Sequence, residues 1–94
     1  MAFLFRLIAP RPSFSQDMSE SEREVMGRHV AHWRGLLEDG TAVAFGPVLD
    51  PAGSWGLGLL DVSLQEQASE LAGSDPAVLS GLCTYELLPM QLVR

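Results

Sequence analysis

Lysine is absent from this chain, so all six basic residues are arginines, and twelve acidic residues outweigh them to give a formal net charge of −6. Domains that bind nucleic acid carry a basic patch or stripe. Anionic membrane surfaces likewise attract clusters of basic residues. The charge balance therefore predicts that neither nucleic acid nor a membrane surface is a partner.

Cysteine is almost absent as well, because Cys83 is the only one. A single cysteine excludes an internal disulfide and favours a reducing cytoplasm. Cys83 lies in an apolar stretch, where we expect a small buried hydrophobic side chain. Two histidines three residues apart and one distant cysteine form no recognisable metal ligand set, so we expect neither a metal nor a cofactor.

Long hydrophobic runs are also missing. Arg6 interrupts the apolar N-terminus, which lacks the positive region of an export signal. No window approaches the roughly 18 apolar residues of a membrane helix. These absences predict a cytoplasmic protein.

The chain is nevertheless rich in apolar residues for its size. Its 94 residues suit one domain, residues 1–94, and 47% of them are hydrophobic, with nine glycines besides. A small domain cannot bury that much apolar surface internally, and a subunit interface is the usual place for the excess. The composition predicts a homodimer.

Periodicity and turn residues predict an α+β order along the chain. Two prolines predict a loop over 9–18, and overlapping capping boxes at Ser19 and Ser21 start a helix near residue 20. The expected elements are strand 2–8, a helix from 20 to Gly40, strands 41–48 and 55–62, a helix capped by Ser63 and ending near 73, a helical turn at 75–76, and strand 82–88.

This order predicts a ferredoxin-like split βαβ subunit, β-α-β-β-α-β, with an antiparallel four-stranded sheet and both helices on one face. The other face needs a cover, which a second copy packed face to face would supply. Gly56 and Gly58 fall on one side of their strand and leave it bare, so that another group can approach the backbone there.

His29 lies within the apolar stripe of the first predicted helix, beside Met26 and Trp33. Imidazole titrates near neutral pH, so a half-buried histidine is a candidate general acid or base. The alternative is a hydrogen-bonded histidine of the core. Trp33 is expected to be core, and His32 lies at the flank of the stripe.

Several stretches occur together in a particular order: Arg28-His29 through Leu37, Gly40 to Pro47, and Ser74-Asp75-Pro76-Ala77-Val78 followed by Gly81. Together they resemble the YCII family of YciI-like proteins. The resemblance covers about residues 22–90. It implies a ferredoxin-like subunit that dimerises into an α+β barrel, and a pocket whose histidine and aspartate are often proposed as an acid–base pair.

His29 and Asp75 match those two positions. Relatives include a dehydrochlorinase that acts on chlorinated hydroxyquinols, although most members have no assigned reaction. This sequence departs from the commoner pattern in its longer connection after the first strand, which contains Arg11 and Phe14.

The resemblance implies a small cofactor-free enzyme that uses His29 and Asp75 for proton transfer, elimination or isomerisation on a small polar or aromatic molecule. A carboxylate bonded to one imidazole nitrogen fixes the tautomer and raises the basicity of the other. We therefore expect a His29 ring nitrogen within hydrogen-bond reach of Asp75, directly or through one water, and facing a cavity.

Other interpretations remain open. A metabolite-binding or accessory module without catalysis, or a dimeric scaffold, would have the same fold. Asp75 precedes a proline and is also a favoured helix cap. Arg11, Arg28 and His32 are candidate substrate-binding residues, with solvated surface as the alternative for each.

Overall fold

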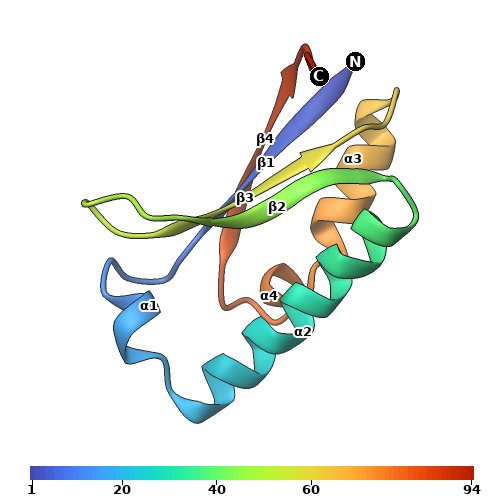
Figure 1. Ribbon diagram of the computed structural model, residues 1–94. Coiled ribbons are helices and arrows are strands. Elements are labelled where there is room, and N and C mark those ends of the chain that lie inside the picture. Colours follow the sequence, from blue (N-terminus) through green and yellow to red (C-terminus); the bar gives the residue numbers. More distant parts are fainter.

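A computed structural model describes all 94 residues as an α+β domain. Its elements are β1 (Ala2–Ile8), α1 (Phe14–Asp17), α2 (Glu20–Glu38), β2 (Ala42–Val48), β3 (Trp55–Leu60), α3 (Gln65–Gly73), α4 (Pro76–Leu79) and β4 (Thr84–Met90). The four strands form one antiparallel sheet in the order β2-β3-β1-β4. Figure 1 shows α2, α3 and α4 together on one side of this sheet. The split βαβ prediction is confirmed.

The main helix, α2, begins and ends where the sequence predicts. Ser19 accepts a hydrogen bond from the Glu22 backbone N–H at 3.2 Å, and Glu22 Oε1 accepts one from the Ser19 N–H at 2.8 Å. Of the two overlapping capping boxes, the first is therefore the one that forms. Gly40 follows the helix with φ of 84°, a left-handed conformation that glycine adopts without steric cost.

Several boundaries differ from the prediction: β3 ends at Leu60 rather than at residue 62, and β4 begins at Thr84 rather than at residue 82. Residues 14–17 form a helical turn, α1, within the expected loop, because Phe14 is buried against the domain. The cap of α3 is Leu64 rather than Ser63, and no side chain caps it. The last strand continues through Pro89 to Met90, which an edge strand such as β4 tolerates because one side of it needs no ladder hydrogen bonds.

The core lies between the sheet and the helices. Trp33 of α2 is 1% exposed and packs against Phe5 of β1, with ring centroids 4.9 Å apart. Its ring lies so close to Gly58 that an added Cβ would come within 2.3 Å of it. The close approach expected on the glycine side of β3 is therefore made by this chain's own tryptophan, and the glycines give no evidence for a second subunit.

The opposite face of the sheet has no helix over it (Figure 1). Leu4 pairs across the sheet with Leu59 and Leu88 on this face, and Leu88 is 54% exposed. Arg6 lies there too, over the Trp55 ring at 4.7 Å and 3.6 Å from Glu86. No helix in the chain is long and apolar enough to cross a membrane.

Candidate functional site

Asp75 connects two parts of the fold that are distant in sequence. It is the N-cap of α4, and its Oδ1 accepts a hydrogen bond from the Ala77 N–H at 2.9 Å. Its Oδ2 lies 2.6 Å from Nδ1 of His29, on α2. The expectation from the sequence is hydrogen-bond reach, directly or through one water, and the contact is direct. Capping and contact with the histidine therefore coexist in one residue, because each carboxylate oxygen serves one of them.

Trp33 supplies a third donor that sequence reasoning missed. Its Nε1–H donates to Asp75 Oδ2 at 2.9 Å, so this oxygen accepts from both the tryptophan and the histidine. Trp33 follows His29 by four residues and so lies on the same face of α2. That spacing could have indicated a shared partner, but the apolar pattern around Trp33 suggested only packing.

The carboxylate of Asp75 is the only fully buried charged group, with 0% exposure. Burial acts to raise its pKa, but the hydrogen bonds from His29, Trp33 and Ala77 outweigh burial and hold the pKa below its ordinary value. An ionised carboxylate only accepts hydrogen bonds. A neutral His29 must then carry its proton on Nδ1, which leaves the lone pair on Nε2.

Nε2 of His29 makes no hydrogen bond within the protein, and the His29 side chain remains 12% exposed. His29 is one of the residues that line a cavity of about 270 Å³. The lining residues are Leu7, Ala9, Phe14, Ser15, Met18, Met26, His29, Val30, Phe45, Gly46, Pro47, Ser54, Trp55, Gly56 and Cys83. The lining is mainly apolar and contains no arginine, aspartate or glutamate.

Cys83 also lines this cavity and is 5% exposed, as expected for a buried hydrophobic side chain. Burial, together with the negative charges of Asp75 and Glu22, raises the pKa of its thiol to about 11. The sulfur is therefore a neutral thiol at neutral pH and not a nucleophilic thiolate. No three histidine, cysteine, aspartate or glutamate side chains come together as a metal ligand set.

The other three candidate binding residues lie outside this cavity. Arg28 has a 62% exposed side chain and lies 3.9 Å from Glu24. His32 Nε2 lies 3.1 Å from the backbone carbonyl of Leu71. Arg11 is bound to acidic side chains and lines a smaller cavity of about 230 Å³. The structure therefore brings none of the three to His29.

The protein is therefore a small ferredoxin-like α+β domain with a His–Asp contact beside an apolar cavity. The YCII-related domain matches residues 2–91, so the chain belongs to that family. The fold is also similar to that of 5-chloro-2-hydroxyhydroquinone dehydrochlorinase (TftG) from Burkholderia phenoliruptrix AC1100, in complex with 2,5-dihydroxybenzoquinone. That likeness has a TM-score of 0.72 at 14% identity and covers 97% of this chain and 94% of that one. No curated protein matches the chain significantly.

Proposed function

We propose that this protein is a small acid–base enzyme in which His29 Nε2 exchanges a proton with a small aromatic or quinoid molecule. The observation that carries the proposal is the 2.6 Å contact between His29 Nδ1 and buried Asp75, with the opposite ring nitrogen unpartnered at an apolar cavity. Asp75 holds the imidazole in one tautomer and stabilises the imidazolium that forms when Nε2 takes a proton.

The reaction class is proton transfer, elimination or isomerisation. In an elimination, Nε2 takes a proton from the substrate, and the electron pair left behind forms a new π bond while an anion departs from carbon. The net loss is a proton and an anion, such as chloride. In an isomerisation, the same nitrogen returns the proton to another atom of the ring. Neither course needs an electron donor or acceptor, so the proposal includes no cofactor.

The lining of the cavity supports an aromatic or quinoid ring as ligand. No arginine lines the cavity, and His29 is the one basic side chain in its lining. Such a pocket binds mainly by burying apolar surface, with a few polar groups to orient the ligand. The dehydrochlorinase of similar fold is named for a substituted hydroquinone and holds a dihydroxybenzoquinone, and both are hydroxylated six-membered rings.

A binding module without catalysis is the second candidate. It is favoured by the scarcity of polar groups in the cavity, where hydroxyls come only from Ser15 and Ser54. Charge that develops on a substrate would then have few donors besides His29 to stabilise it.

Chloride release from 5-chloro-2-hydroxyhydroquinone tests the two candidates. If the protein is an enzyme for this class, His29→Gln lowers the rate at least about 100-fold, the usual range for a lost general base. His32→Gln, a matched change on the same helix, leaves the rate unchanged. Binding of 2,5-dihydroxybenzoquinone to the wild type without chloride release would favour the binding module. If the wild type neither releases chloride nor binds 2,5-dihydroxybenzoquinone, the proposed class of ligand is refuted.

We also propose a cytoplasmic homodimer that packs through the uncovered sheet face. This face carries cross-strand leucines, including Leu4, Leu59 and the half-exposed Leu88. Exposed apolar patches of this kind favour a protein interface. Sedimentation should show a dimer at micromolar concentration and a monomer for Leu59→Glu, whose charge would be buried in the interface. A compact wild-type monomer would refute the proposal.

A further inference from the structure

The wall of the cavity nearest the first strand comes from the connection between β1 and α2. Of its eleven residues, four line the cavity: Ala9, Phe14, Ser15 and Met18. The only regular structure in it is α1, a single turn of four residues. A helical turn of this length is not stable by itself, because the free-energy cost of helix nucleation exceeds the stabilisation from its few hydrogen bonds. Something outside α1 must fix this wall.

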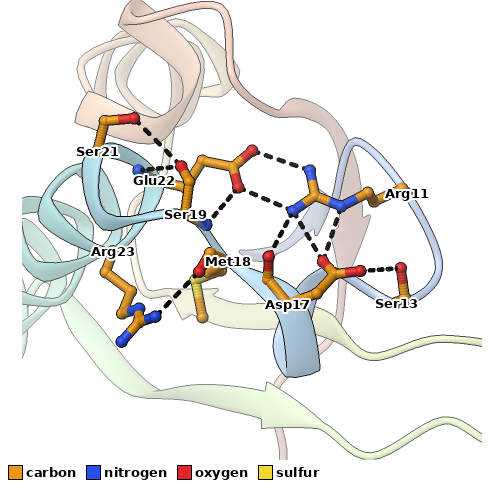
Figure 2. A network of polar contacts seen from close by, with 8 residues as sticks. All are labelled: Arg11, Ser13, Asp17, Met18, Ser19, Ser21, Glu22 and Arg23. Carbon is orange, nitrogen blue, oxygen red and sulfur yellow. Dashed lines mark hydrogen bonds and ion pairs between the residues drawn. The ribbon is translucent and has the colours of Figure 1, made fainter.

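Arg11 is the residue that does so, through hydrogen bonds to the last residue of the turn and to the helix beyond it. Its Nε donates to Asp17 Oδ1 at 2.8 Å and its Nη2 to the Asp17 backbone carbonyl at 3.1 Å. Nη1 and Nη2 donate to the two carboxylate oxygens of Glu22 at 2.9 and 2.8 Å. Figure 2 shows the guanidinium between the two acidic side chains, with the Ser13 hydroxyl on the far side of Asp17.

This group of Arg11, Asp17 and Glu22, the Arg11 clasp, joins the segment to the start of α2. Glu22 is itself fixed, because its Oε1 also accepts the Ser19 N–H of the capping box. Isolated surface ion pairs contribute little, but a two-pronged arginine contact within a network of charges is the favourable exception. The guanidinium also lies 5.3 Å from the centroid of the Phe14 ring, the buried residue of α1.

Removing Arg11 does more than remove its hydrogen bonds, because it also leaves two negative charges close together. One oxygen of Asp17 and one of Glu22 each lie 2.8 Å from the same Nη2, so at most twice that distance separates two negative charges. The bonds from Arg11 hold the pKa of Glu22 at about 2, and that of Asp17 is also lowered, first by Ser13 and then by Arg11. Without the arginine, both carboxylates stay ionised at neutral pH and repel each other.

We propose that Arg11 is a positioning residue whose contacts with Asp17 and Glu22 hold α1 as a wall of the His29 cavity, and that they limit the size of ring the cavity admits. Arg11 then acts on ligands through Phe14 and Met18, without touching them. The selectivity part rests on the proposed function, because it takes the cavity to be the ligand site.

The first arm of the test needs no ligand. Amide hydrogen exchange of residues 13–18 should be about tenfold faster or more in Arg11→Gln, since local opening sets the exchange rate of such segments. The matched control is Arg28→Gln, which removes an arginine from α2 that pairs only with Glu24. Exchange in the control should equal that of the wild type. The double variant Arg11→Gln/Asp17→Asn removes one of the repelling charges and should recover part of the protection.

The second arm measures affinities for phenol and 4-tert-butylphenol in each protein. Because each variant is compared through the ratio of the two affinities, the intrinsic difference between the rings cancels. In Arg11→Gln the ratio should shift about tenfold towards the larger ring, a change typical of one altered pocket wall. The ratio in Arg28→Gln should remain that of the wild type.

Unchanged amide exchange at residues 13–18 in Arg11→Gln would refute the proposal that the Arg11 clasp holds α1 in place. Faster exchange with an unchanged affinity ratio would overturn its role in selectivity. If neither phenol binds the wild type, the proposed function fails, whereas the exchange arm still decides whether Arg11 holds α1.

Discussion

Replacing Gly58 with alanine tests the packing that holds the Trp33 ring where its Nε1–H donates to Asp75. The added Cβ would lie 2.3, 2.4 and 2.9 Å from three atoms of the Trp33 ring. Contacts below 3.0 Å require a shift, and this ring is 1% exposed and already packed against Phe5. Inserting a group into such a core costs about 1–3 kcal/mol.

Alanine also stiffens the unfolded chain, which stabilises a protein by about 0.4–1 kcal/mol where the backbone accepts the residue. Gly58 does not have a positive φ, so this gain applies. The net expectation is a loss of about 0.5–2 kcal/mol in the free energy of unfolding, measured by urea denaturation, since overpacking exceeds the entropic gain. Each kcal/mol corresponds to roughly 4–8 °C in Tm for a domain of this size.

Gly46→Ala is the matched control on the neighbouring strand. An added Cβ there meets nothing within 4 Å, and the glycine pairs across the sheet with Leu57 of β3. Its free energy of unfolding should equal that of the wild type or exceed it slightly. A Gly58→Ala protein as stable as this control would show that the Trp33 ring is not held against β3. Packing against β3 would then not explain how Trp33 is placed to donate its hydrogen bond to Asp75.

Three further outcomes follow from the site. Because hydrogen bonds hold the pKa of Asp75 below its ordinary value near 3.9, the ionised form stabilises the fold above about pH 4, and this contribution is lost as pH falls through the folded pKa. Asp75→Asn should remove that part of the acid limb in urea titrations and cost about 1–3 kcal/mol at pH 7, because its amide must face one of the three donors; an unaltered acid limb would contradict this. Trp33→Phe keeps a ring against Gly58 but loses the bond to the carboxylate, so urea denaturation should show a loss of at least about 1.5 kcal/mol, and an unchanged stability would count against that bond. The Cys83 thiol, with its pKa raised to about 11, should react with iodoacetamide at pH 8 far more slowly in the folded protein than in guanidinium, and equal rates would mean that it is not buried.

Much of the fold follows from local signals in the chain. The capping box at Ser19 and the left-handed Gly40 bound α2 because each acts within a few residues. The order of strands and helices then determines the topology. The contact between His29 and Asp75 was predictable from that order together with the family resemblance, since the topology brings α2 beside the end of the second crossover.

Features that depend on distant partners were not predictable. α1 forms because Phe14 is buried and Arg11 binds across to Glu22, eleven residues away, and no local pattern encodes either contact. The apolar spacing of α2 places Trp33 in the core but says nothing of where its N–H points. Arg11 carried a charge suited to a substrate, and only the structure shows that acidic side chains occupy its donors.

We propose that Asp75 fixes His29 with its proton on Nδ1 and leaves Nε2 free at the cavity. Nitrogen-15 NMR of the His29 ring, recorded at a pH where the imidazole is neutral, measures this directly because the two ring nitrogens have different shifts in the two tautomers. We expect a protonated Nδ1 and an unprotonated Nε2, whose signal moves when 2,5-dihydroxybenzoquinone is added. A proton on Nε2 in the neutral ring would refute this role of Asp75, because Nδ1 would then have no hydrogen to donate to the carboxylate.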